Sequence, residues 1–188
     1  MTLEILISCM HQKDASLVSR SGIYGSAVMV NQCDREGRET LVQPGGGKVR
    51  IIHTTQRGLT RSRNMAIRES QADICMLCDD DEVFVPDHEK KILEAYEENP
   101  QADVIIFKMV NRPTPFPDRA FRLRFPKTMK VSSWQISFRR QRLLEKEVSF
   151  DELLGAGTGN GAEEELKFLL DCQRKGLEIW YVPVALAS

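Results

Sequence analysis

A chain of 188 residues is long enough for one domain around a single buried core and too short for two full domains. Hydrophobic residues make up 41% and charged residues 28%, an ordinary balance for a globular protein, and no apolar run is long enough to form a transmembrane helix. The formal net charge is only −1, but the charge is unevenly distributed along the chain.

The first part of the sequence alternates between short apolar runs and helix-like segments. The apolar runs, which predict strands, are 3–9, 27–30, 49–53, 74–78 and 104–107. Segments 59–70 and 88–98 have helical composition, and the second ends before Asn99-Pro100, which stops a helix. Short apolar strands that alternate with helices indicate an α/β three-layer sandwich with a mostly parallel central sheet buried on both faces.

The pattern changes after residue 107. Segment 111–117 holds three prolines and predicts a loop, whereas 121–125 and 134–138 alternate apolar and polar residues. We expect these two segments to form half-buried antiparallel strands, each with one polar face. A glycine-rich loop at 155–161 precedes a predicted helix at 163–175, and 177–182 is the last predicted strand. The helix has Leu166, Leu169 and Leu170 on its inner side, and Gly176 ends it.

The cysteines and the first residues of the chain indicate in which cellular compartment the protein lies. The five cysteines are an odd number in apolar stretches, which favours reduced core thiols over disulfides: Cys9, Cys33, Cys75, Cys78 and Cys172. Cys75 and Cys78 have CxxC spacing, but residues three apart in a strand point to opposite faces. The chain begins directly in a strand pattern without the order of a signal peptide, so we expect a cytoplasmic protein.

Residues 108–146 form a basic segment. They include 11 Lys and Arg against 2 Asp and Glu, a charge of +9, which leaves −10 on the rest of the chain. Aromatic residues are interleaved with these cations, a combination that suits anionic headgroups at the inner face of a membrane, phosphate-bearing substrates or nucleic acid. Nucleic acid is the least favoured of these partners, and a solvated basic face is the structural alternative.

The strongest local signal is Asp79-Asp80-Asp81, which follows the predicted strand 74–78 directly. Consecutive carboxylates after a buried strand repel one another and call for a positive partner. In an extended chain Asp79 and Asp81 project to one side, where both can approach one hard cation. The alternative is a solvated acidic turn before Pro86.

Two further segments combine charge with a helix start. Arginines cluster from Arg57 to Arg63 around a predicted helix N-terminus, which favours an anion such as a diphosphate, or is a solvated basic edge. Residues 163–165 are three glutamates in the first turn of a later helix, where they stabilise the helix dipole or supply a general base. The glycines at 45–47 lack the spacing of a phosphate-binding loop and predict a turn between strands.

Taken in order, these segments resemble the family-2 glycosyltransferases with the GT-A (Rossmann-like) fold, over residues 3–183. The matching motifs are Ser8-Cys9-Met10-His11, Asn31-Gln32 at the end of the second strand, Ser62-Arg63-Asn64, Asp79-Asp80-Asp81, and Glu164-Glu165 after the glycine-rich loop. The resemblance implies one domain, 1–188, with a nucleotide-sugar-binding half at 1–107 and an acceptor-side half at 108–188.

The resemblance also implies a reaction and its residues. It implies inverting transfer of a sugar from a nucleoside diphosphate donor, UDP favoured, to a glycan or lipid-linked acceptor in bacterial surface polysaccharide or glycan synthesis. Mn²⁺ or Mg²⁺ would be held by Asp81 and Asp79, and Glu165 or Glu164 would be the general base. The residues implied at the donor nucleotide are Cys9, His11, Asn31, Arg57, Arg63, Asp79 and Asp80.

The sequence departs from the family pattern in places. Glu165 stands where the family has Asp, and His11, Asn31 and Gln32 replace the usual residues at the nucleobase. The chain also ends soon after the last motif, where family members often continue, so we expect a truncated or minimal transferase. Two rivals remain: a nucleotidyltransferase, whose glycine-rich loop is missing after the first strand, and a non-catalytic module that binds nucleotide, membrane or nucleic acid.

Overall fold

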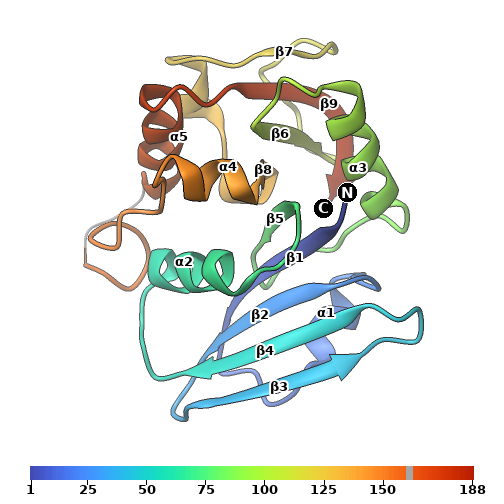
Figure 1. The fold of residues 1–188 in the computed structure, drawn as a ribbon, viewed down its shortest axis with the longest axis vertical. Helices are drawn as coiled ribbons and strands as arrows, with labels where there is room; N and C mark the ends of the chain where they lie inside the picture. The colour runs from blue at the N-terminus through green and yellow to red at the C-terminus, as the bar shows by residue number, and fades with distance from the viewer. Residues whose placement is uncertain (160–162) are drawn as a thin grey trace.

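A nine-stranded sheet runs through the molecule in the order β3-β4-β2-β1-β5-β8-β6-β9-β7 (Figure 1). The structure is a computed structural model, and it describes residues 1–159 and 163–188. The strands are β1 Leu3–Met10, β2 Ala27–Gln32, β3 Gly37–Val42, β4 Lys48–Thr54, β5 Ile74–Cys78, β6 Val104–Met109, β7 Phe121–Arg122, β8 Ile136–Arg139 and β9 Ile179–Ala187. The helices are α1 Ser16–Arg20, α2 Leu59–Glu69, α3 His88–Glu98, α4 Arg140–Glu145 and α5 Glu164–Arg174, with short 3₁₀ turns η1 Lys127–Lys130 and η2 Ser133–Gln135.

Most of the strands run in one direction. The neighbours β4, β2, β1 and β5 are parallel, as are β6 and β9. In the described part of the chain, β3, β7 and β8 run against the others, and β8 lies between β5 and β6. The α/β class and the predominantly parallel direction predicted from the sequence are confirmed.

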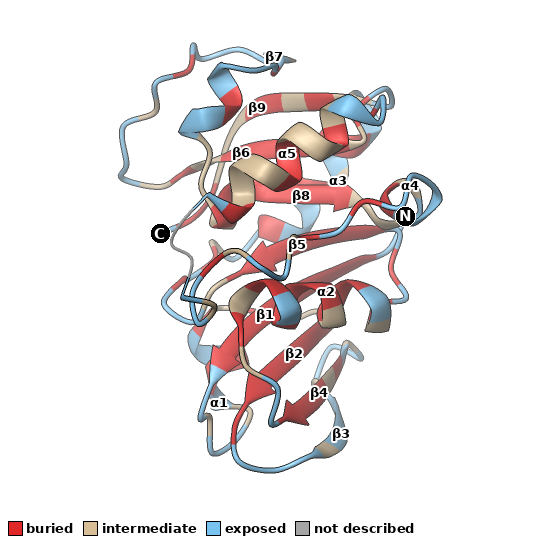
Figure 2. Ribbon diagram, turned by 90° about the vertical axis from the view of Figure 1, so that its left-hand side faces the viewer, coloured by how far each residue is buried: buried red, intermediate tan, exposed pale blue. Residues whose placement is uncertain are grey.

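Side chains on the two faces of the sheet form two separate cores. On one face Ile5 and Ile7 of β1 pack in a cluster with residues of α1 and α3. On the other face Leu6 of β1 packs in a cluster with residues of α2, α4 and α5. Figure 2 shows the central strands, such as β1, β2 and β5, as buried along most of their length, whereas the edge strands β3 and β7 are exposed or half-buried. The predicted three-layer sandwich is therefore present, because alternate residues of each strand face opposite helix layers.

The apolar runs in the first half predict five strands correctly, but β3 was missed. Its sequence is mostly polar, and five of its six residues are exposed, because it is an edge strand paired only with β4. The glycines at 45–47 lie in the turn that joins β3 to β4, as predicted. Gln43 N donates to Gly47 O at 2.7 Å to close this turn.

The second half differs more from the prediction. The strand expected at 121–125 covers only Phe121–Arg122, and the strand expected at 134–138 begins at Ile136. Its expected polar face does not exist, because β8 lies inside the sheet and Ser137 is completely buried. In α5 the inner residues are Phe168, Leu169 and Cys172, whereas Leu166 and Leu170 are half-buried.

Both halves of the chain contribute strands to the same sheet, since β8 and β9 of the second half lie in it together with β1 of the first. All five cysteines are buried and free. No helix within residues 1–159 and 163–188 is long and apolar enough to cross a membrane.

Candidate functional site

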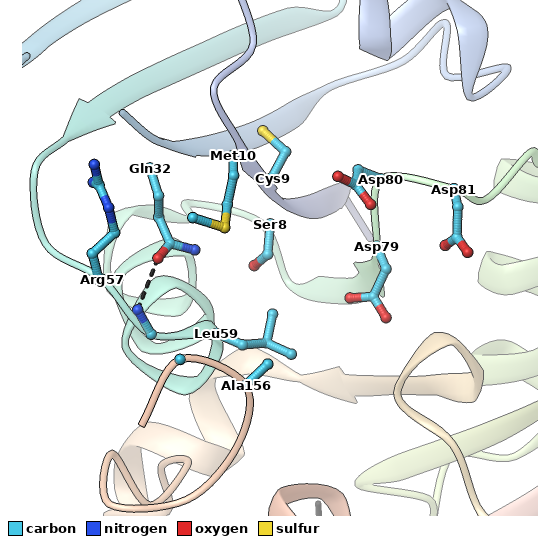
Figure 3. Close-up of a pocket in the computed structure, with 12 residues that line it drawn as sticks. Ser8, Cys9, Met10, Gln32, Arg57, Leu59, Asp79, Asp80, Asp81 and Ala156 are labelled. Carbon is cyan, nitrogen blue, oxygen red and sulfur yellow. Dashed lines mark hydrogen bonds between the residues drawn. The ribbon is translucent and has the colours of Figure 1, made fainter. Parts of the chain in front are cut away.

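A cavity of about 610 Å³ opens where the parallel strands β1, β2 and β5 end (Figure 3). Ligand sites in open α/β sheets lie outside the carboxyl ends of such strands. The lining residues are Ser8, Cys9, Met10, Gln32, Arg57, Gly58, Leu59, Asp79, Asp80, Asp81, Ala156 and Gly157. Of the residues predicted at the site, this cavity brings together Cys9, Arg57, Asp79, Asp80 and Asp81.

The acidic run does not stay extended. β5 ends at Cys78, and the chain turns at Asp80 and Asp81, so the alternation assumed from the sequence does not apply. Figure 3 shows the Asp79 and Asp80 side chains pointing in different directions. Neither the Asp80 nor the Asp81 side chain has a hydrogen bond or ion pair with residues 1–159 or 163–188, and both line the cavity. These two carboxylates are therefore the ones available to a ligand.

Asp79 is held by two partners inside the protein. Arg63 Nη2 donates to Asp79 Oδ1 at 3.0 Å, and Ser133 Oγ donates to Asp79 Oδ2 at 2.8 Å. Ser133 lies in η2 and was not singled out by the sequence, because nothing in the motif indicates which distant hydroxyl meets it. Both Asp79 oxygens thus have a protein donor, which fixes the orientation of the carboxylate.

Arg63 lies beneath the cavity and does not line it. It is on the buried face of α2 and only 1% exposed, and its guanidinium carbon lies 5.4 Å from the centre of the Phe150 ring. Besides Asp79, its Nη1 donates to Glu165 Oε1 at 3.2 Å and lies 3.8 Å from Glu164 Oε1. Three carboxylates surround the guanidinium, so Arg63 faces them and not the cavity, and its place near the nucleotide stays a prediction.

The predicted general-base residues lie at the N-terminus of α5. Glu164 is 6% exposed, and burial followed by the charge of Glu165 raises its pKa. One of its oxygens, Oε2, is buried without a hydrogen-bond partner in the described part of the chain. The glycine-rich loop predicted before this helix is described as far as Gly159, and its end at Gly161 lies outside the described residues. Arg63 pairs with Asp79 and with both glutamates, which brings Glu164 and Glu165 near Asp79. Neither glutamate lines the cavity.

Gln32 and Arg57 form the side of the cavity opposite the acidic turn. Gln32 Oε1 accepts a hydrogen bond from Gly58 N at 2.8 Å, which joins the end of β2 to the start of α2 (Figure 3). Arg57 Nη1 donates to Cys33 O at 2.8 Å, and Arg57 Nη2 donates to Asp34 Oδ1 at 2.9 Å. These contacts orient the arginine that lines the cavity.

His11 and Asn31 do not line this cavity. The Asn31 carboxamide is buried, and it accepts from Gln12 N at 2.9 Å and donates to Gln12 O at 2.8 Å. It also contacts Nδ1 of the buried His53 at 3.1 Å, so it has no group left to face a nucleobase. His11 lines a neighbouring cavity of about 370 Å³ that includes Gln12. Asn31 therefore positions the loop that carries His11.

Burial shifts the pKa of two other groups beside the site, Glu82 and Cys9. Glu82 follows the acidic turn and is 3% exposed, and neither of its carboxylate oxygens has a hydrogen-bond partner within residues 1–159 and 163–188. Burial, together with the charge of Asp79, raises the pKa of Glu82 to about 8. Burial raises the pKa of the Cys9 thiol to about 12, so this thiol is uncharged at the cavity wall.

The fold and the site define an α/β protein with a ligand cavity at the carboxyl ends of its parallel strands, lined by carboxylates and an arginine. Residues 28–155 match the family model described as glycosyl transferase family 2. The chain therefore belongs to glycosyl transferase family 2, as its motifs indicated.

One curated relative and several solved structures are similar to the chain. An uncharacterized glycosyltransferase of Haemophilus influenzae is 31% identical over 91 residues, which are 48% of this chain and 31% of that protein. S. aureus TarS 1–349 in complex with UDP has a TM-score of 0.76 at 16% identity, and in complex with UDP-GlcNAc 0.70 at 15%. These matches cover all of this chain and 60% and 58% of the TarS chains, so the chain spans only part of the length of its relatives. At this identity the likeness to TarS shows the fold alone.

Proposed function

We propose that the cavity binds the nucleoside diphosphate of a sugar donor, and that the chain transfers this sugar to a hydroxyl group of an acceptor. The observation that carries the proposal is the cavity itself. Asp80 and Asp81, which have no partner among the described residues, lie on one side of it, and the oriented Arg57 lies on the other. Family membership and the UDP and UDP-GlcNAc complexes of TarS support a nucleotide sugar, with UDP as the favoured nucleotide.

The acidic turn can supply one or two carboxylates to a divalent cation. Mg²⁺ in nucleotide sites is bound by one or two carboxylates together with substrate phosphates and water. No group of three potential His, Cys, Asp or Glu ligands is assembled within residues 1–159 and 163–188, but Asp81 is exposed to the cavity and has no protein partner. We therefore assign Mn²⁺ or Mg²⁺ to Asp81, with Asp79 held beside it by Arg63 and Ser133. When bound, the cation would offset the charge that grows on the diphosphate leaving group.

The transfer needs a base for the acceptor hydroxyl. The proposed step is a single displacement: the acceptor oxygen forms a bond to the anomeric carbon on the face opposite the diphosphate, and the bond to the diphosphate oxygen breaks. Glu165 accepts the acceptor proton, and this geometry inverts the anomeric configuration. Glu164 is the alternative base, because burial raises its pKa and makes its carboxylate more basic. Arg63 holds both glutamates near Asp79.

A ligand-dependent thermal shift tests the donor site, because a ligand that binds only the folded chain raises its melting temperature. UDP with Mn²⁺ is expected to raise the melting temperature more than UDP with a chelator. Asp81→Asn should reduce this difference, whereas Asp118→Asn, an exposed carboxylate away from the cavity, should leave it unchanged. An undiminished shift in Asp81→Asn, or no response of the native chain to UDP in either condition, would overturn the proposal.

A second candidate function is peripheral contact with an anionic membrane, which would place the chain at the inner face of the membrane. The observation that favours it is that two apolar side chains are exposed among cations. Phe125 is 52% exposed and lies between Arg124 and Lys127, and Met129 is 59% exposed and lies between Lys127 and Lys130. Sedimentation with phosphatidylserine vesicles is expected to pull down the chain at low salt, and less of it after Phe125→Ser. Equal sedimentation with neutral phosphatidylcholine vesicles would contradict a role for these cations.

A further inference from the structure

A second cavity, of about 310 Å³, lies beside the donor cavity and has a different character. The proline-rich loop that follows β6 forms one wall, and the segment around η1 and η2 forms the other. Its lining residues are Met109, Arg112, Pro113, Thr114, Pro115, Lys130, Ser132, Trp134 and Gln135. Apart from its two cations, the lining is uncharged, so no carboxylate on its wall neutralises them.

The two cations of this cavity are not held by acidic residues in the part of the chain that the structure describes. Neither Arg112 nor Lys130 forms an ion pair with any residue in 1–159 or 163–188, although many other cations of the chain do. The Arg112 guanidinium carbon lies 5.2 Å from the centre of the Trp134 ring, so the aromatic side chain holds this cation at the cavity. Two cations directed to one cavity without a counter-charge favour the binding of an anion.

The second cavity is joined directly to the proposed transfer site. Ser132 and Trp134 line it, and Ser133 between them donates a hydrogen bond to Asp79 of the donor cavity at 2.8 Å. The Ser133–Asp79 hydrogen bond therefore connects the wall of this cavity to the acidic turn. A ligand bound in this cavity would therefore lie beside the acidic turn at Asp79–Asp81.

We propose that this second cavity binds the acceptor saccharide through a phosphate or carboxylate group that the saccharide carries, with Arg112 and Lys130 as the anion-binding residues and Trp134 holding Arg112 in place. The proposal rests on the proposed function, because it assigns the acceptor of the same reaction. Thr114 and Ser132 add hydroxyl groups to the wall, which suits a ligand that combines an anion with sugar hydroxyls.

The indole signals of the chain provide a local measure of binding. The chain has two tryptophans, and Trp180 lies elsewhere, where its Nε1 donates to Glu178 Oε2 at 3.1 Å. In ¹H–¹⁵N correlation spectra, glucose 6-phosphate or glucuronate is expected to shift the Trp134 indole signal and leave that of Trp180 in place. Glucose, which has no charge, and inorganic phosphate, which has no sugar ring, should each bind more weakly than the charged sugar.

Paired substitutions identify the residues responsible. Arg112→Gln and Lys130→Gln are each expected to weaken binding of the charged sugar at least about fivefold, since each removes a charge-assisted contact. Lys127→Gln is the matched control: Lys127 lies in η1 with Lys130, but its ammonium group stacks on Phe121 at 5.0 Å from the ring centre. The affinity of Lys127→Gln for the charged sugar should stay within about twofold of that of the native chain, because the Lys127 side chain does not line this cavity.

Any of several binding results would overturn the proposal. These are equal binding of glucose and glucose 6-phosphate, equal binding of inorganic phosphate and the charged sugars, and unchanged binding in both Arg112→Gln and Lys130→Gln. The UDP-dependent thermal shift of the same variants separates this outcome from a failure of the proposed function. A normal UDP response with no charged-sugar binding rejects the acceptor assignment alone, whereas charged-sugar binding without a UDP response rejects the donor site.

Discussion

Arg63 and Asp79 form an ion pair at 3.0 Å in which the guanidinium is almost completely buried. The same guanidinium reaches Glu165, which lies 102 residues further along the chain. It therefore connects the acidic turn after β5 with the start of α5, the two segments to which we assign the metal and the general base. The spacing between these groups depends on one planar cation, because only Arg presents several donors in a fixed geometry.

Replacing Arg63 should be costly for stability. Arg63→Met leaves Asp79, Glu164 and Glu165 close together without their cation, and we expect a loss of about 3–5 kcal/mol in the free energy of unfolding. Arg61→Met is the control on the same helix, since the Arg61 side chain is 44% exposed and its pair with Glu152 is long at 3.5 Å. Its loss should stay below about 1 kcal/mol. Urea unfolding of both variants measures the difference, and similar losses would contradict the bridging role.

Ser133 should affect the donor site more than it affects the fold. Ser133→Ala removes one of the two donors to Asp79, and a hydrogen bond to a charged group contributes about 1.5–3 kcal/mol. We expect metal-dependent UDP binding, measured by titration calorimetry, to weaken by about tenfold, which corresponds to 1.4 kcal/mol. Ser149→Ala, at an exposed serine, should bind UDP as the native chain does. If the two variants bind alike, the Ser133–Asp79 contact has no role at the site.

The elements with repeating apolar residues could be predicted from the sequence, because burial imposes the pattern. β5 and α3 were placed at their observed residues, since one is apolar throughout and the other ends before Asn99-Pro100. β3 was missed because an edge strand exposes its side chains and needs no apolar pattern. The position of β8 between β5 and β6 could not be predicted either, since pairing across the sheet depends on tertiary contacts.

Several residues that line the cavity were singled out from the sequence, but their contacts were not. The run Asp79–Asp81 was found because consecutive carboxylates are conspicuous in any sequence. The burial of the Arg63 side chain was not predicted, since the sequence does not distinguish an arginine that binds a ligand at a helix start from one that is buried there. The same applies to Asn31, whose carboxamide is used entirely within the protein by Gln12 and His53. Such choices follow from packing between segments far apart in the chain.

The turn at Gly22 should be intolerant of any side chain. Gly22 has φ of +70°, and a Cβ atom there would lie 2.8 Å from the carbonyl oxygen of Phe84, just after the acidic turn. Gly46 has φ of +89° with nothing within 4 Å, so Gly46→Ala isolates the cost of the left-handed backbone, about 1 kcal/mol. We expect Gly22→Ala to lose a further 1–3 kcal/mol or so, because backbone atoms must move. Thermal unfolding of the two variants tests this prediction. Equal losses of stability would show that the backbone at Phe84 moves away from the new Cβ atom without cost.

His88 should make the fold sensitive to mild acid. Its side chain is 3% exposed, its ring lies 4.7 Å from that of Phe84, and Nδ1 contacts Val85 O at 2.8 Å. Burial lowers the pKa of His88 below its usual 6.5, so the folded chain favours the neutral ring, with Nδ1–H donating to Val85 O. The stability from this group is complete above pH 6.5 and is lost as pH falls through the lower folded pKa, because the unfolded chain then binds a proton that the folded chain does not.

The slope from one such proton is at most about 1.4 kcal/mol per pH unit. His88→Asn keeps a donor toward Val85 O but cannot titrate, so its free energy of unfolding should rise relative to that of the native chain as pH falls from about 7 to 5. Glu82, whose raised pKa favours the folded chain as pH falls, acts equally in both chains and cancels in this comparison. His11→Asn, at an exposed histidine, should keep the native pH dependence. Urea unfolding at several pH values measures the three slopes. Parallel slopes for the native chain and His88→Asn would mean that His88 does not contribute to the pH dependence in this range.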